Sequence, residues 1–369
     1  MPTLEETTRQ ILALPREAGT PEAAKARELV AAHLRALGFD VVSQAFSFAP
    51  SSLRAFPIFG AGLGWLALVL LPFLVSVRMP AWSALAIWAV GLGSLITVAT
   101  GIGLGWVLLG EPLREDANLL ATQGETSPTR WIVAHLDSKA QAHSMAGRLV
   151  ALWCVALAIT ALGALALFRL QAPLHPGWAG AGAAMALVAG FLAGRGRLKG
   201  RSLGARDNGT GIVAALAAAA AASDRRVGIL ITGAEEFGLV GARVFAQLAP
   251  DLRSTEFVNV DTVDEEGKLY LVSHNQMGER LAASLEPHLA GLGLPIKRRR
   301  LPLGIFVDSA PLARAHAPAV TVGRLTWRTL RCIHTPADTP QRLSFDTAEQ
   351  VGKAIVYQQE HEPRMNTKR

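Results

Sequence analysis

The hydrophobic pattern divides the chain into long uncharged stretches and polar segments that contain shorter apolar runs. The uncharged stretches span residues 56–77, 81–110, 149–168 and 177–194. A helix needs about 20 residues to cross the hydrocarbon core of a bilayer. None of the four stretches has the regularly spaced polar positions that mark a helix on a soluble surface. The pattern therefore predicts four transmembrane helices.

The predicted helices form two hairpins, because residues 78–80 and 169–176 are short connections. Each hairpin leaves and returns on the same side of the bilayer. The basic residues on that side are Arg54, Arg114, Lys139, Arg148, Arg195, Arg197, Lys199 and Arg201, whereas the far connections hold only Arg78 and Arg169. Positive charge gathers on the cytoplasmic side of membrane proteins. We therefore expect an integral membrane protein, of the plasma or inner membrane if the chain is prokaryotic, with its polar segments in the cytoplasm.

The polar segments together predict one interrupted α/β domain. Thr20 followed by Pro21 is typical of a helix start, and Gly38 of its end. Apolar runs predict strands at 39–48, 130–134, 227–232, 256–260 and 319–322, and helices at 211–222 and 239–248. This alternation favours a mostly parallel sheet with helices on both faces. The basic run Lys297–Arg300 is expected to be a solvated loop.

The predicted organisation has five segments. Residues 1–55, 111–148 and 195–369 supply the α/β domain, while 56–110 and 149–194 are the two transmembrane hairpins.

Composition agrees with a membrane protein. Half of the 369 residues are hydrophobic and only 18% are charged, and the mean hydropathy is positive, at +0.30. The net charge of +7 comes from basic residues that flank apolar runs and are not interleaved with aromatic residues. We therefore expect a lipid bilayer as a partner and no nucleic acid.

Two features of the sequence exclude other classes. The only cysteines are Cys154 and Cys332, too few for a cysteine-based zinc cluster or for more than one disulfide. Residues 1–20 include three glutamates and no apolar core, so they do not have the pattern of a secretory signal.

Acidic and histidine residues directly follow three of the predicted strands. His135 and Asp137 follow the strand at 130–134, Glu235 and Glu236 follow the one at 227–232, and Asp261 follows the one at 256–260. The carboxyl ends of strands in an open parallel sheet line the ligand crevice. These side chains are therefore expected at one edge of the sheet.

Two polar loops add Asp207 and His334 to this set. Taken singly, Asp207 is most simply a helix cap and His334 a surface residue. Together with His135, Glu236 and Asp261, they have the imidazole and carboxylate groups that two divalent cations need.

Spacing suggests roles for the two remaining acids. Asp137 is two residues after His135, on the same face of extended backbone, where it could accept the ring N–H of that histidine. Glu235 and Glu236 are adjacent, so their side chains diverge. One can bind metal while the other faces an attacking water as general base.

Five motifs occur in order: His-x-Asp at 135–137, Asp-Asn-x-x-Gly at 207–211, Glu-Glu-x-Gly-x-x-Gly at 235–241, Asn-x-Asp at 259–261 and His-Thr-x-x-Asp-Thr at 334–339. As a set they resemble the M28 family of zinc metallopeptidases, as do residues 15–20, the helix ending at Gly38, and residues 307–312. The resemblance covers nearly all of the polar sequence and none of the apolar hairpins. It departs from soluble members where two predicted spans separate His135 from Asp207.

The resemblance implies a zinc aminopeptidase-like fold and two zinc ions, with other divalent metals as alternatives. It implies that Asp207 bridges the metals, that His334 and Glu236 bind one or other metal, and that His135 and Asp261 complete the pair. Glu235 would be the general base, and Asp137 the partner behind His135.

These features favour a membrane-bound two-metal peptidase that hydrolyses the N-terminal bond of a peptide through a metal-bridging water. A carboxypeptidase, dipeptidase or other amidohydrolase stays open, because Arg299, Arg324 or Arg328 could bind a substrate carboxylate. A glutaminyl cyclase is less expected, since the two-metal ligand set is complete. A transporter is disfavoured because the uncharged stretches lack ionisable residues, while a non-catalytic membrane scaffold stays open.

Overall fold

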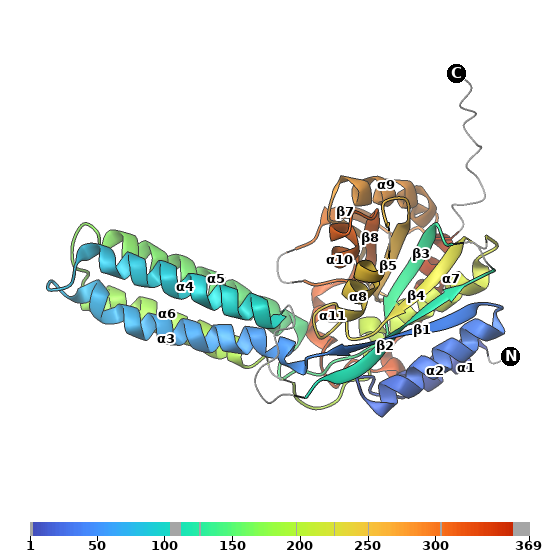
Figure 1. Ribbon diagram of the computed structural model, residues 1–369, viewed down its shortest axis with the longest axis horizontal. Helices are drawn as coiled ribbons and strands as arrows, with labels where there is room; N and C mark the ends of the chain where they lie inside the picture. Colours follow the sequence, from blue (N-terminus) through green and yellow to red (C-terminus); the bar gives the residue numbers. More distant parts are fainter. Residues whose placement is uncertain are drawn as a thin grey trace, which may run out of the picture. The chain divides into compact units, whose positions relative to one another are not determined.

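The computed structural model describes residues 3–103, 112–124, 127–196, 198–224, 226–249, 251–302 and 305–356. The chain forms two compact units, shown in Figure 1. The first unit comprises the described residues of Met1–Phe48, Arg114–Ala140 and Arg201–Arg369, and the second those of Ala49–Leu113 and Gln141–Gly200. Each unit is therefore assembled from separate stretches of the chain.

The first unit is built on an eight-stranded sheet in the order β1-β2-β4-β3-β5-β8-β6-β7. The strands are β1 (Asp40–Phe48), β2 (Arg114–Thr122), β3 (Arg130–His135), β4 (Val227–Thr232), β5 (Glu256–Val263), β6 (Lys268–Ser273), β7 (Ile296–Arg300) and β8 (Ala319–Leu325). Strands β4, β3, β5 and β8 are parallel neighbours. Antiparallel pairing joins β1 to β2, β2 to β4 and β6 to β8. The predicted α/β class is confirmed, with a parallel centre and antiparallel pairs towards both margins.

Helices cover both faces of the sheet, because the side chains of its central strands alternate between two cores. Ile132 and Ala134 of β3 pack in one core with residues of α1 (Leu4–Leu12), α2 (Pro21–Ala36), α7 (Thr210–Ala221), α9 (Gln276–Ala290) and α12 (Asp346–Ala354). Trp131 and Val133 point the other way and pack with residues of α8 (Val240–Leu248) and α10 (Ser309–Arg314). A strand that is buried on both faces is apolar throughout, and for this reason the sequence showed these strands clearly.

Among its described residues the second unit has four α-helices: α3 (Ala55–Val75), α4 (Ala81–Gly103), α5 (Met145–Phe168) and α6 (Pro176–Gly194). All four are long and apolar enough to cross a membrane, and they coincide with the four uncharged stretches. Residues 104–110 of the predicted second span, and Arg197 of the basic set, lie outside the described residues.

Besides the apolar core that the helices share, two specific contacts join them. A Cβ atom placed on Gly190 of α6 would lie 2.3 Å from the carbonyl oxygen of Gly60 in α3, so only glycine permits this close approach. In the connection between α5 and α6, the guanidinium of Arg169 donates to the carbonyl oxygens of Phe73, Ser76 and Met79. Arg169 therefore ties the far end of one hairpin to the far end of the other.

The expectation of a loop at Lys297–Arg300 is wrong, because these residues form most of β7. This strand pairs in parallel with β6 at the margin of the sheet, and its four basic side chains are exposed. An edge strand pairs along one side only, and charged side chains there keep other chains from adding to the sheet. The residues of β7 do not alternate between apolar and polar, so the sequence pattern did not predict this strand.

Candidate metal centre

The structure brings all five predicted metal ligands to the carboxyl edge of the parallel strands. His135 ends β3, Glu236 lies in the turn after β4, and Asp261 lies within β5. Asp207 belongs to the turn Ala205–Gly209 that leads into α7, and His334 follows α11 (Trp327–Cys332). All are buried except Asp261, which is partly exposed. Residues distant in sequence thus form one cluster.

The cluster contains two groups of potential ligands. His135, Glu235 and Asp261 form one group, and Asp207, Glu236 and His334 form the other; within each group the ligand atoms lie within 4.8 Å of one another. Glu235 and Glu236 therefore diverge into different groups, as their adjacent positions predicted.

Asp207 connects the two groups. Its Oδ1 lies 3.2 Å from Nε2 of His135, and its Oδ2 lies 3.1 Å from Nε2 of His334. Each carboxylate oxygen is thus directed to a different imidazole. This arrangement suits a carboxylate that bridges two cations.

The contacts of His135 suit a metal ligand. Its Nδ1 lies 3.0 Å from the main-chain carbonyl oxygen of Asp137. A carbonyl can only accept, so Nδ1 carries a proton, and Nε2 faces Asp207. Burial lowers the pKa of His135, but the charge of Glu235 and the hydrogen bonds to Asp137 and Asp207 outweigh it and raise that pKa well above its usual range. Nε2 of the metal-free protein therefore also carries a proton, whose place a bound metal ion would take.

Nδ1 of His334 and Oδ1 of Asp308 have no hydrogen-bond partner among the described residues. Oε1 of Glu236 contacts the imidazole of His334, with its Nε2 at 3.1 Å. Buried polar atoms are normally paired, and a site that leaves them open commonly holds an ion. The donor set of imidazole and carboxylate, without thiolate, suits Zn²⁺ and similar divalent metals.

Asp137 supports the cluster in two ways. Its main-chain carbonyl takes the ring N–H of His135, whereas its carboxylate Oδ1 lies farther from Nδ1, at 3.7 Å. The carboxylate instead accepts the backbone N–H groups of Glu235 and Glu236, both at 3.0 Å. Because β3 ends at His135, the extended backbone that the prediction assumed stops there. The predicted partner is thus present, but through a main-chain atom.

A buried arginine ties the segments that carry His135 and Asp207. The guanidinium of Arg16, which is fully buried, donates to the carbonyl oxygens of Leu136 at 2.8 Å, Leu203 at 2.7 Å and Gly204 at 3.0 Å. Burial lowers the pKa of Arg16 to about 10, so it still carries its charge at neutral pH. Residues 15–20 resembled the M28 family, but nothing in the sequence indicated this role.

Asp338 fixes the other side of the turn at Asp207. Its carboxylate accepts the backbone N–H of Arg206 at 2.8 Å and that of Asp207 at 3.2 Å. Burial raises the pKa of Asp338 to about 6. The aspartate of the His-Thr-x-x-Asp-Thr motif therefore holds the backbone of a predicted ligand.

Burial and neighbouring charges give the carboxyl groups of the cluster different pKa values. Burial, together with the charges of Glu236 and Asp308, raises the pKa of Glu235 well above its usual range. Burial raises the pKa of Asp261 to about 7. Burial also acts on Glu236, but the charges of His334 and Lys139 outweigh it and lower the pKa of that carboxyl to about 2. Of the carboxyls whose pKa is raised here, Asp261 is a proposed metal ligand, which leaves Glu235 to exchange a proton.

Two charged residues of the cluster were missed. Lys139 was expected only as one of the basic residues on the cytoplasmic side, but its side chain is buried and its Nζ lies 2.5 Å from Oε2 of Glu236. Asp308 is 1% exposed, and its Oδ1 has no hydrogen-bond partner among the described residues. Asp308 falls in the segment 307–312 that resembled the M28 family, whereas the position of Lys139 gave no signal.

Of the three arginines that could bind a substrate carboxylate, two contact other groups and one is largely exposed. The Arg299 guanidinium lies over the Tyr270 ring, 5.5 Å from its centroid. Arg324 donates to the carbonyl oxygens of Gly267 and Asp264. Arg328 is largely exposed, and its guanidinium lies 3.9 Å from a carboxylate oxygen of Glu266.

A sequence model described as peptidase family M28 matches residues 118–358. This match confirms the resemblance of the five motifs to that family. No curated protein sequence matches the chain.

Several solved structures share the fold. An aminopeptidase from Aneurinibacillus sp. strain AM-1 is 15% identical, with 96% of this chain and 92% of that one covered and a TM-score of 0.55. The zinc aminopeptidase BSAP from Bacillus subtilis is 16% identical, with 97% and 95% covered and a TM-score of 0.54. A glutaminyl cyclase from Fimbriiglobus ruber is 16% identical, with 97% and 94% covered and a TM-score of 0.55. At this identity the likeness shows the fold alone, and it includes enzymes with two different activities.

Proposed function

The chain belongs to peptidase family M28, and from that premise we propose that it is a membrane-bound, zinc-dependent aminopeptidase with two metal ions. The observation that carries the proposal is the position of Asp207, whose two carboxylate oxygens face the imidazoles of His135 and His334. Asp207, Glu236 and His334 would hold one zinc ion, and Asp207, His135 and Asp261 the other. Other divalent metals suit the same oxygen and nitrogen ligands.

Zinc, when bound, supplies a Lewis acid for the scissile carbonyl and lowers the pKa of a water molecule. The protein supplies the proton transfer. Glu235 is buried beside His135 and Asp261, and it takes the proton of the attacking water and returns it to the leaving amine. Asp137 positions Glu235 by accepting its backbone N–H.

The surroundings favour a substrate with a free amino terminus. A carboxypeptidase needs a cation for the terminal carboxylate of its substrate. Arg299 and Arg324 contact other groups, and Arg328 is a largely exposed side chain 3.9 Å from Glu266. The cluster itself is rich in buried carboxylates, which attract the ammonium group of an amino terminus. These observations support an aminopeptidase over the carboxypeptidase alternative.

The four apolar helices support insertion in a membrane, and the basic residues that flank them support a cytoplasmic location for the first unit. Extraction of membranes at alkaline pH tests insertion, because an integral protein stays with the lipid. Reporters fused to the C-terminus and to the connection that contains Arg78 test the orientation, which predicts the C-terminus on the cytoplasmic side and the connection on the other side.

A substrate panel tests the reaction. Detergent-purified protein is given peptides with free amino termini, with blocked amino termini and with blocked carboxyl termini, with and without a chelator. We expect cleavage of every peptide with a free amino terminus, and its loss on chelation. Cleavage of blocked amino termini alone would overturn the aminopeptidase proposal. A peptide that begins with glutamine separates hydrolysis from cyclisation, because a glutaminyl cyclase releases ammonia and leaves the chain uncut.

A further inference from the structure

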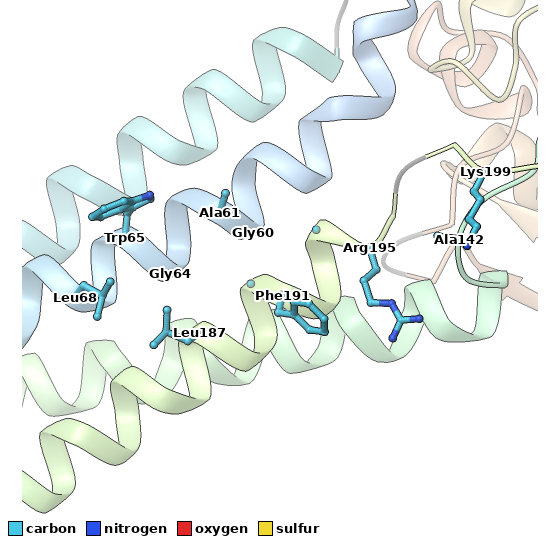
Figure 2. A pocket seen from close by; sticks show the side chains of 12 residues that line it. Gly60, Ala61, Gly64, Trp65, Leu68, Ala142, Leu187, Phe191, Arg195 and Lys199 are labelled. Atoms are coloured by element: carbon cyan, nitrogen blue, oxygen red, sulfur yellow. The ribbon is translucent and has the colours of Figure 1, made fainter.

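A cavity of about 660 Å³ opens on the second unit between α3 and α6, as Figure 2 shows. Its size falls within the range of small-ligand pockets, about 300–1,000 Å³. Glycines of both helices line it, among them Gly60, Gly64 and Gly190. The two backbones touch at Gly60 and Gly190, and the missing side chains leave a groove beside this contact.

Large apolar side chains border the groove. Trp65 and Leu68 project from α3, and Leu187 and Phe191 from α6 (Figure 2). Trp65 is 70% exposed and Phe191 67% exposed. On a helix that crosses a bilayer, such side chains contact lipid chains. Each side of the groove therefore presents one aromatic and one aliphatic side chain, which a hydrocarbon chain could contact.

One end of the cavity is cationic. Arg195 directly follows the last residue of α6, and Lys199 lies four positions further; both are exposed and both line the cavity. Neither side chain has a hydrogen-bond or ion-pair partner within the described part of the chain. Two exposed cations therefore lie at the end of the groove where α6 finishes and α3 begins.

We propose that this cavity is a binding site for an anionic phospholipid. The phosphate lies between Arg195 and Lys199, and one acyl chain follows the groove along Trp65, Leu187 and Phe191. Charge complementarity selects the anionic headgroup, and the apolar walls on helices of membrane-crossing length select a lipid over a soluble phosphate. Anionic lipids are abundant in the cytoplasmic leaflet, the side on which the basic residues are expected.

This inference rests on the proposed membrane insertion and not on the peptidase reaction. The test uses the full chain in nanodiscs of phosphatidylcholine with increasing phosphatidylglycerol, one of the two lipids carrying brominated acyl chains. Bromine quenches tryptophan fluorescence on contact, and the difference between the protein and its Trp65→Phe variant isolates Trp65. We expect brominated phosphatidylglycerol to quench Trp65 at a lower mole fraction than brominated phosphatidylcholine.

Charge variants decide whether Arg195 and Lys199 cause the preference. A cation beside an anionic surface contributes a factor of about five in affinity, so Arg195→Ala or Lys199→Ala should weaken the preference about five-fold and the double variant about 25-fold. Arg195→Lys should retain it. Arg78→Ala is the matched control, because Arg78 is an exposed arginine on the connection between α3 and α4, and it should change nothing.

Each other outcome counts against the site. Equal quenching by the two brominated lipids, or an unchanged double variant, would show ordinary lipid contact. Displacement by inorganic phosphate at the same concentration as the lipid would show a phosphate site without an acyl chain. A protein that stays outside the bilayer overturns the proposed insertion and the lipid site together. Quenching is measured without a peptide substrate, so an inactive protein with the lipid preference loses only the proposed reaction.

Discussion

The replacement Lys139→Met should tighten zinc binding while making the metal-free protein less stable. Nζ of Lys139 lies 2.5 Å from Oε2 of Glu236, and both side chains are almost fully buried. The lysine therefore occupies one oxygen of a proposed zinc ligand and places a positive charge beside the site of a second cation. Methionine keeps most of the length of the side chain and removes the charge.

The magnitude follows from a thermodynamic cycle. Removing one partner of a buried ion pair costs about 3–5 kcal/mol, because the other charge is left buried and uncompensated. A bound zinc ion compensates that charge, so the metal-bound protein loses less stability than the metal-free protein. The difference appears as zinc affinity. If zinc recovers about 3 kcal/mol of the cost, binding tightens about 100-fold.

Two measurements on chelator-treated protein check this prediction. Thermal unfolding without metal should begin at a lower temperature in the variant, and the rise in Tm on adding zinc should be larger. Titration calorimetry should show the tighter site directly. Arg27→Met is the control, because Arg27 pairs with the buried Asp116, outside the ligand set; it should lower stability without changing zinc affinity. Equal or weaker zinc binding by Lys139→Met would refute the reasoning.

Three further predictions concern the reaction, the metal-free fold and the helix pair. Glu235→Gln should lower kcat by about 10²–10⁴-fold with unchanged zinc content by atomic absorption; full activity would remove Glu235 as the base. The pKa of Asp338 is raised from an ordinary 3.8 to about 6 in the fold. Protonation of its carboxyl therefore stabilises the metal-free fold below about pH 4, and this stabilisation, about 3 kcal/mol, is lost as the pH rises through 6. Denaturation of metal-free protein should therefore show stability falling from pH 4 to 7, less so in Asp338→Asn, and an equal slope in both would contradict this. Gly190→Ala should destabilise the helical unit by about 1–3 kcal/mol through its contact with Gly60, whereas Gly180→Ala meets nothing within 4 Å and should leave Tm unchanged.

The five metal-ligand candidates could be predicted because each follows an apolar strand or lies in a motif with a fixed spacing. Sequence order and the rule that strand ends share one edge were enough to place His135, Glu236 and Asp261 together. Asp207 and His334 needed the family resemblance, since each alone has an ordinary explanation as a cap or a surface residue. The central strands were clear because both of their faces are buried.

The residues that the sequence did not reveal act through contacts between distant segments. Arg16 binds carbonyl oxygens of Leu136 and Gly204, and a main-chain acceptor leaves no trace in the residue type. In the sequence, Lys139 looks like one of the basic residues that flank a transmembrane helix. Its contact with Glu236 depends on how distant segments fold together. Strand β7 carries charges because it is an edge, and its pairing with β6 depends on backbone groups alone.

The division of the first unit into separate stretches has a consequence for biosynthesis. In the sheet, β4 lies between β2 and β3, yet the ribosome makes it only after all four apolar helices. Four of the five proposed ligands are also translated after the last of these helices. The nascent chain therefore cannot complete its sheet, or its proposed metal centre, before all four apolar helices have been synthesised. Any product truncated before His334 lacks at least one of the five proposed ligands.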